Sequence, residues 1–101
     1  MYLSDFENEK FMLEIMDNLV SINDREYTLN IVLSELNLLL FKNIKKDSVL
    51  SAREIHEMPE YELIVKINLN ELKYDIDDNN TVINYSGNEI ILYNFNLKDA
   101  L

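Results

Sequence analysis

Residues 27–46 read YTLNIVLSELNLLLFKNIKK and form the longest apolar stretch of the chain without a glycine or proline. Apolar side chains recur in it at steps of three and four residues, which places them on one stripe of a helix. This stripe consists of Leu29, Val32, Leu33, Leu36, Leu39, Leu40 and Ile44. Because Ile31, Leu38 and Phe41 fall outside the stripe, such a helix has to be covered on more than one side. The pattern favours one long, largely buried helix.

The first third of the same stretch has a second interpretation. Residues 27–33 also alternate, with apolar side chains at the odd positions. A period of two residues is typical of a strand, which would lead into a shorter helix from about Glu35. We favour the long helix because its stripe continues to Ile44 without a break.

Length and composition limit the number of domains and the kinds of chemistry that the chain can support. At 101 residues the chain has room for a single domain, residues 1–101. It holds no cysteine, which excludes disulfides and thiolate metal sites and is compatible with a reducing compartment. Its first residues lack the basic start and apolar run of a signal peptide, and no stretch approaches the length of a membrane span. We therefore expect a soluble, cytoplasmic protein.

Negative charge is the strongest global signal of the sequence. The formal net charge is −10, from 19 acidic and 9 basic residues. Direct binding to nucleic acid depends on lysine and arginine to neutralise phosphates, and an anionic membrane surface attracts the same residues. The composition argues against both of these partners and favours a positively charged protein.

The chain before and just after the apolar stretch predicts further helices. Residues 5–22 carry apolar side chains at helical spacing and acidic residues in the first turns, which suits the positive end of a helix dipole. Asn23 and Asp24 then break the pattern. Ser51 and Glu54 have the spacing of a capping box, and Pro59 forbids helix continuation, so residues 51–58 predict a short helix.

Beyond the proline the period changes to two. Residues 60–69 alternate as a half-buried strand, and the phase flips near Asn70, which requires a turn or a bulge. Residues 81–85 and 89–97 flank Gly87, the single glycine of the chain, and predict a tight hairpin. With Gly87 and Asn88 as the two loop residues, we expect Ile83, Tyr85, Ile90 and Leu92 on one face of this hairpin and Val82, Ile91 and Tyr93 on the other. Because both faces are partly apolar, we expect a helix to cover one and a loop or a partner to cover the other.

These elements together predict an α+β fold class. We expect two N-terminal helices and a short helix, packed on a three- to four-stranded antiparallel sheet that ends in a C-terminal hairpin.

No residue set in the sequence specifies an enzyme, a cofactor or a metal. His56 is the single histidine, and alone in a charged helix it is best explained as a surface residue. Asp75, Asp77 and Asn79 have the spacing that opens a calcium loop, but the next position is not glycine and the twelfth is Ser86 rather than glutamate. One glycine cannot form a glycine-rich phosphate loop. We therefore predict a protein that is not an enzyme and needs no cofactor.

Acidic residues of the C-terminal half are the candidate partner-binding residues. Carboxylates spaced along a sheet and its turns can present negative charge at intervals similar to those of phosphates. The residues we predict for this role are Glu60, Glu62, Glu71, Asp75, Asp77 and Asp78, and the alternation places all of them except Asp78 on the outward face. A face that only keeps the protein soluble would use the same residues.

The leading functional hypothesis is a small acidic inhibitor that blocks a basic, nucleic-acid-binding protein. Anti-CRISPR and DNA-mimic inhibitors of phages and mobile elements share this size and charge as a broad class, although no motif connects this chain to a named family. The alternative is an immunity protein, an antitoxin or a small dimeric subunit that docks through apolar residues of the central helix, such as Leu38 and Phe41. An enzyme with scattered carboxylates has the least support.

Overall fold

The computed structural model describes residues 9–43 and 61–101. These residues form one antiparallel sheet of seven strands and a helix of four residues. The strands are β1 (Phe11–Ile22), β2 (Arg25–Ser34), β3 (Asn37–Asn43), β4 (Tyr61–Asn68), β5 (Tyr74–Asp77), β6 (Asn80–Tyr85) and β7 (Asn88–Leu92), and the helix is α2 (Leu97–Ala100). Their order across the sheet is β4-β3-β2-β1-β7-β6-β5. Two meanders, β1–β4 and β5–β7, therefore meet where β1 pairs with β7.

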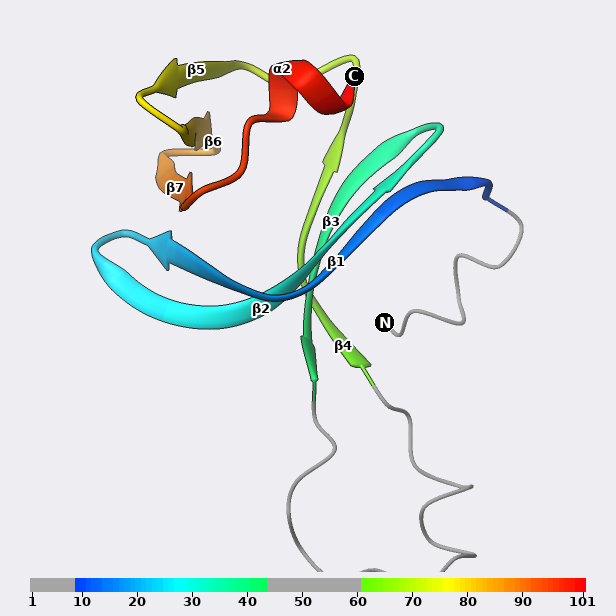
Figure 1. Ribbon diagram of the computed structural model, residues 1–101, viewed down its shortest axis with the longest axis horizontal. Helices are drawn as coiled ribbons and strands as arrows, with labels where there is room; N and C mark the ends of the chain where they lie inside the picture. The colour runs from blue at the N-terminus through cyan, green and yellow to red at the C-terminus, as the bar shows by residue number, and fades with distance from the viewer. Residues whose placement is uncertain (1–8, 44–60) are drawn as a thin grey trace, which may run out of the picture.

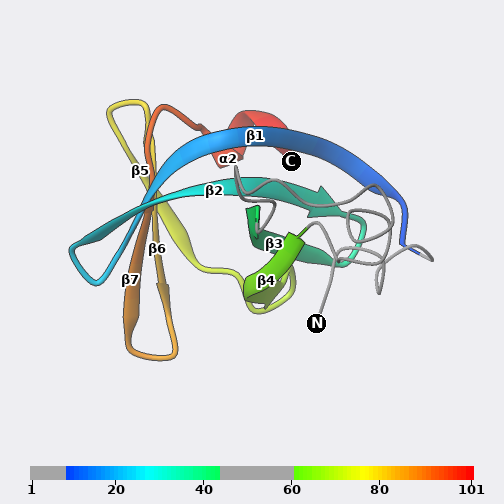
Figure 2. The same cartoon turned by 90° about the horizontal axis from the view of Figure 1, so that it is seen from below.

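The sheet is strongly curved. Figures 1 and 2 both show β5, β6 and β7 across from β3 and β4, with α2 between the two groups. An up-and-down barrel would close by pairing β4 with β5, but here these two strands are the two ends of the sheet. The fold is thus a half-open barrel with a concave inner face and a convex outer face.

The main hydrophobic core lies on the inner face. Residues of β2, β3 and β4 meet residues of β6, β7 and the C-terminal segment in a single buried cluster. Its members are Val20, Leu29, Ile31, Leu33, Leu38, Leu40, Ile67, Ile83, Ile90, Leu92, Phe95 and Leu97. Curvature of the sheet is what allows the two meanders to share this core.

Thr81 fastens the C-terminal segment to the inner face. The buried hydroxyl of Thr81 on β6 donates a hydrogen bond of 2.6 Å to the carbonyl oxygen of Phe95. It also accepts one of 2.9 Å from the backbone N–H of Leu97. The side chains of Phe95 and Leu97 are both buried in the core, so the residues after β7 fill the interior of the half-open barrel.

The predicted α+β fold class is wrong, because the residues expected in the two N-terminal helices form strands. Residues 11–22 form β1, and the central stretch divides into β2 and β3. Alternation was therefore the correct interpretation of residues 27–33, while the helices proposed from Glu35 and over the whole stretch are both wrong. The predicted short helix at residues 51–58 lies outside the described residues.

A bulge explains why β1 carries apolar residues at helical spacing. Asp17 has a φ of 51°, and the register with β2 shifts between Ile15 and Asn18. The side-chain amide oxygen of Asn30 accepts a hydrogen bond of 2.9 Å from the backbone N–H of Asp17 and holds the bulge. Ile15 faces the core before the bulge and Val20 after it, so the inner positions change from odd to even numbers. Across the bulge, the apolar residues of β1 are therefore spaced in the sequence as they would be in an amphipathic helix.

β3 resembles a buried helix in sequence because it is apolar on both faces. Leu38 and Leu40 belong to the inner core. Leu39 and Phe41 pack with Val32 in a second buried cluster on the outer face. A run that is apolar at every position fits both a helical and a strand period, so periodicity alone cannot assign it.

The turns of the N-terminal half use residues other than glycine and proline. Asn23 and Asp24 have φ values of 50° and 68° and form a two-residue turn between β1 and β2. Positive φ at both positions is the type I′ geometry, which asparagine and aspartate tolerate. Between β2 and β3, the Ser34 hydroxyl accepts hydrogen bonds from the backbone N–H groups of Leu36 (3.3 Å) and Asn37 (3.0 Å). The first turn lies at the boundary between the two predicted helices, and the second lies in the interior of the predicted long helix.

The strand predictions for the C-terminal half are confirmed in part: β7 ends at Leu92 instead of continuing to residue 97, and Asn88 belongs to β7 rather than to the loop. β4 ends at Asn68, and a turn precedes β5 at the predicted change of phase. In the predicted hairpin, Ile83 pairs with Ile90, and the chain turns at Ser86 and Gly87, both with positive φ.

Candidate partner-binding surface

The acidic residues predicted for partner binding do not form one surface. Glu62 lies on β4 and Asp75 on β5, and these strands are the opposite ends of the sheet. Glu71 is exposed in the connection between them, and Glu60 lies outside the described residues. The three that come together are Asp75 and Asp77 on β5 and Asp78 in the following turn, all of them exposed.

A second bulge turns Glu62 away from the outer face, where the alternation had placed it. The register between β3 and β4 shifts next to Phe41, which pairs with Leu63. Leu63 packs against the outer cluster, whereas its neighbour Glu62 pairs with Lys42 and lines a pocket on the inner side. Glu62 is therefore not part of the same surface as the acidic residues of β5.

An apolar strip on the outer face adjoins the acidic residues of β5. Val82 on β6 pairs with Asp75 on one side and with Ile91 on the other. In the next row, the backbone N–H of Tyr93 donates a hydrogen bond of 3.1 Å to the carbonyl oxygen of Leu19. We call these four apolar residues the outer strip: Leu19, Val82, Ile91 and Tyr93.

The outer strip is accessible to a partner. Leu19 is 43 % exposed, the other three residues are half-buried, and none of the four belongs to the inner core. Exposed acidic side chains border the strip: Asp75 and Asp77 on the β5 side, Glu26 on β2 and Glu89 on β7. An apolar centre with a polar rim is the usual anatomy of a protein–protein interface.

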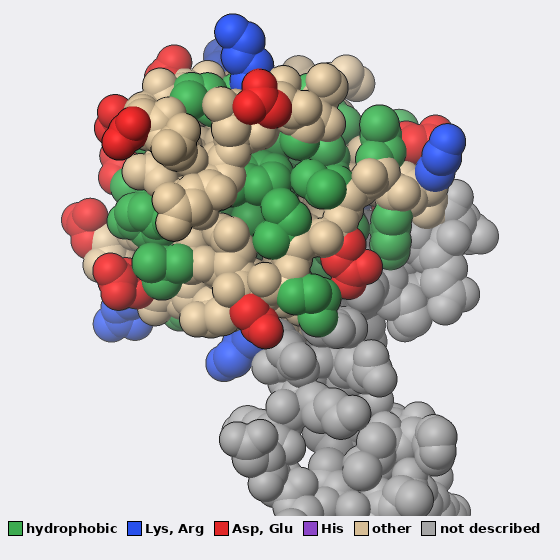
Figure 3. Space-filling view, viewed as in Figure 1, with side chains coloured by type: hydrophobic (Ala, Val, Ile, Leu, Met, Phe, Trp, Pro, Cys, Tyr) green, Lys and Arg blue, Asp and Glu red, His purple; other side chains and the backbone are tan. Residues whose placement is uncertain are grey.

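The remaining acidic residues are distributed around the molecule. Figure 3 shows acidic side chains around the edge of the face seen in Figure 1, several of them at the corner that β5 occupies. Hydrophobic side chains gather in the middle of this face, between α2 and β1. On this side, the described residues form no continuous acidic surface, so the grouping on β5 is local.

The apolar helix face suggested as an alternative docking surface does not exist. Leu38 and Phe41 are both fully buried in β3, one in the inner core and the other in the outer cluster. Neither side chain is available to a second copy or to another partner.

Sequence reasoning found part of the outer strip and missed the rest. The hairpin prediction placed Val82 and Ile91 on one face, and their pairing confirms this. Leu19 was missed because it was assigned to the buried side of a helix. Asn23 and Asp24 could have revealed it, since asparagine and aspartate are the residues other than glycine that most readily adopt the positive φ of a type I′ turn.

No chemical motif accompanies this surface. Within residues 9–43 and 61–101, no three residues of the types His, Cys, Asp and Glu are grouped so as to hold a metal ion. The predicted surface residue His56 lies outside these ranges. The described part of the chain contains no helix of the length and hydrophobicity that a bilayer crossing requires. Comparison of the chain with protein-family models, with curated proteins and with solved structures found no match.

Proposed function

We propose that this protein is a non-enzymatic inhibitor that binds a basic protein through the outer strip and the acidic residues of β5. The observation that carries the proposal is that exposed Asp75 and Asp77 stand on the last strand of the sheet, where Asp75 pairs with Val82 of the strip. The partner we propose is a nucleic-acid-binding protein, because carboxylates can occupy a site built for phosphates. Inhibition is then competitive, as in DNA-mimic and anti-CRISPR proteins of phages and mobile elements.

The two parts of the surface contribute in different ways. Full burial of an exposed large apolar side chain contributes about 1.5–3 kcal/mol, and each strip residue, already partly buried, contributes a fraction of this on binding. Exposed ion pairs at a rim contribute only about 0.2–1 kcal/mol each. The carboxylates instead accelerate association with a basic partner and reject acidic ones, and this effect weakens as salt rises.

The test compares two double charge reversals. Asp75→Lys with Asp77→Lys changes the β5 edge, whereas Glu14→Lys with Glu35→Lys changes the net charge equally at exposed positions of β1 and of the β2–β3 turn. Asp78 is left unchanged because its φ of 60° favours aspartate. The tagged proteins are used to capture partners from cell extract, and the captured protein is then purified and titrated directly. We expect the β5 reversal to weaken binding about tenfold at low salt and the control reversal to have little effect.

A third variant tests the outer strip. Leu19→Ser removes an apolar side chain that is already 43 % exposed, so the fold should tolerate it. We expect faster dissociation of the purified partner with a nearly unchanged association rate. Equal weakening by both charge reversals, or an acidic captured partner, would contradict the proposed function.

A further inference from the structure

A pocket of about 420 Å³ opens on the inner side, with residues of β4 and of β7 among its lining. Its size is within the range of small-molecule sites. Figure 2 shows the β6–β7 turn, which directly precedes the pocket residue Asn88, at the opposite end of the view from α2. The apolar lining comes from four strands, β1, β2, β4 and β7: Ile22, Tyr27, Leu29, Ile64, Val65 and Ile90.

Two of the apolar side chains in this pocket are open to solvent. Ile64 is 41 % exposed and Tyr27 is 37 % exposed, although both are large. Ile64 is the extra residue of the bulge in β4, because the residues on either side of it pair with consecutive residues of β3. Leu29 and Ile90 are each 2 % exposed and form the buried end. The pocket therefore offers apolar surface that a bound molecule could cover.

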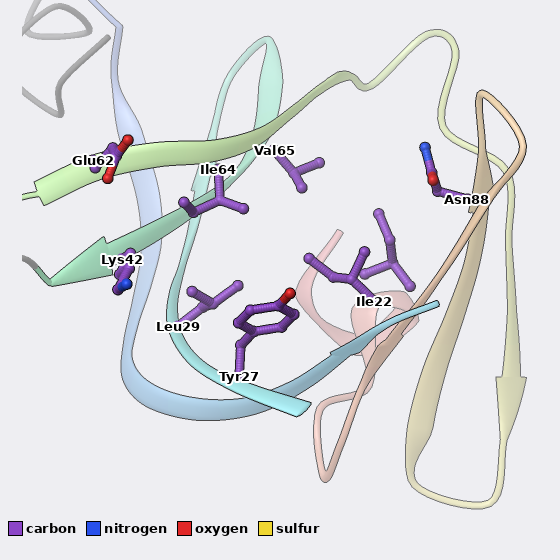
Figure 4. A pocket seen from close by; sticks show the side chains of 9 residues that line it. Ile22, Tyr27, Leu29, Lys42, Glu62, Ile64, Val65 and Asn88 are labelled. Atoms are coloured by element: carbon purple, nitrogen blue, oxygen red, sulfur yellow. The ribbon is translucent and has the colours of Figure 1, made fainter. Parts of the chain in front are cut away.

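The charged side chains of the pocket stand at one of its ends. Figure 4 shows Lys42 and Glu62 together on one side and Asn88 on the other, with the apolar side chains between them. The amide of Asn88 is used structurally, since its oxygen accepts a hydrogen bond of 2.7 Å from Asn23. Lys42 and Glu62 are exposed and stand opposite each other on neighbouring strands.

We propose that this pocket binds a small zwitterion with a large apolar side chain, of which a free α-amino acid such as phenylalanine is the simplest form. A ligand with a single charge meets one favourable and one unfavourable residue at the Lys42–Glu62 end. A zwitterion meets two favourable residues, with its carboxylate facing Lys42 and its ammonium facing Glu62. Its apolar side chain then covers Ile64 and packs against the ring of Tyr27. The site is on the inner side and does not depend on the outer strip.

Three probes that share a phenyl group but carry different charged groups test the head-group assignment. The full-length protein is titrated with L-phenylalanine, with phenethylamine, which lacks the carboxylate, and with 3-phenylpropionate, which lacks the ammonium. Binding is followed by backbone amide chemical shifts. We expect a Kd on the order of 1 mM for phenylalanine, given the affinity that a ligand of this size typically reaches. Each singly charged probe should bind about fivefold more weakly.

Matched variants separate the charges from the apolar wall. Lys42→Gln should weaken the binding of phenylalanine about threefold and leave the binding of phenethylamine unchanged. Glu62→Gln should also weaken the binding of phenylalanine about threefold, but leave the binding of 3-phenylpropionate unchanged. Ile64→Ser should abolish binding of all three probes, whereas Leu36→Ser changes a more exposed apolar side chain in the β2–β3 turn and should have no effect. Equal affinity for the three probes would overturn the zwitterion assignment. If the amide groups around the pocket show no chemical shift change at a phenylalanine concentration about ten times the expected Kd, the site itself is overturned.

Discussion

Leu38→Ala is expected to lower the free energy of unfolding by about 2–5 kcal/mol, because it leaves a cavity in the inner core. Leu38 is fully buried and pairs with Leu33 on one side and Ile67 on the other, so its neighbours come from both adjacent strands. Chemical denaturation, followed by circular dichroism, measures the change.

Leu36→Ala is the matched control for this prediction. Leu36 is 57 % exposed in the β2–β3 turn, two residues before Leu38, and its replacement should change the free energy of unfolding by about 0.5 kcal/mol or less. The long helix inferred from periodicity predicts the opposite order, since Leu36 belongs to its stripe and Leu38 does not. A larger loss for Leu36→Ala than for Leu38→Ala would therefore contradict the seven-stranded fold.

Thr81→Val should lower the free energy of unfolding by about 1–3 kcal/mol, although valine has nearly the same shape. The substitution removes both hydrogen bonds of the buried hydroxyl and leaves the carbonyl oxygen of Phe95 and the N–H of Leu97 without that partner. Amide hydrogen exchange gives a second measurement. We expect faster exchange at Leu97, because its N–H donates to the Thr81 hydroxyl.

Thr28→Val and Thr81→Ser are the controls. Thr28 is exposed on β2, so the same chemical change there should alter stability by about 0.5 kcal/mol or less. Thr81→Ser retains the hydroxyl and should retain most of the protection of the Leu97 amide. Unchanged exchange at Leu97 in Thr81→Val would show that the hydroxyl does not hold the C-terminal segment.

The sequence was informative wherever strand signals were local. Gly87 marked the β6–β7 hairpin, and the alternation around it assigned Ile83 and Ile90 to the same face. In the N-terminal half, the same rules failed for physical reasons. A bulge at Asp17 changed the phase of β1, and β3 carries apolar residues on both faces. A one-residue phase change exchanges the two faces of a strand, so a strict period of two could not be observed.

The candidate surface was also predicted in part. Alternation correctly indicated that Asp75 is exposed, because β5 is short and regular. It failed for Glu62, because the bulge beside Ile64 exchanges the faces at the start of β4. The outer strip combines β1 with β6 and β7, and a contact between elements so distant in sequence leaves no local signal that could place Leu19 beside Tyr93.

The pairing of β1 with β7 also has a kinetic consequence. Among the described strands, this three-pair ladder from Val20–Leu92 to Ile22–Ile90 is what joins the two meanders. The pairs β1–β2, β2–β3, β5–β6 and β6–β7 are local hairpins, which form on microsecond timescales. The β1–β7 ladder instead brings together segments that are about 70 residues apart in the chain, so it carries a larger loop-closure entropy. We therefore expect the encounter of the first and last strands to limit refolding, and to make it slow for a chain of this length.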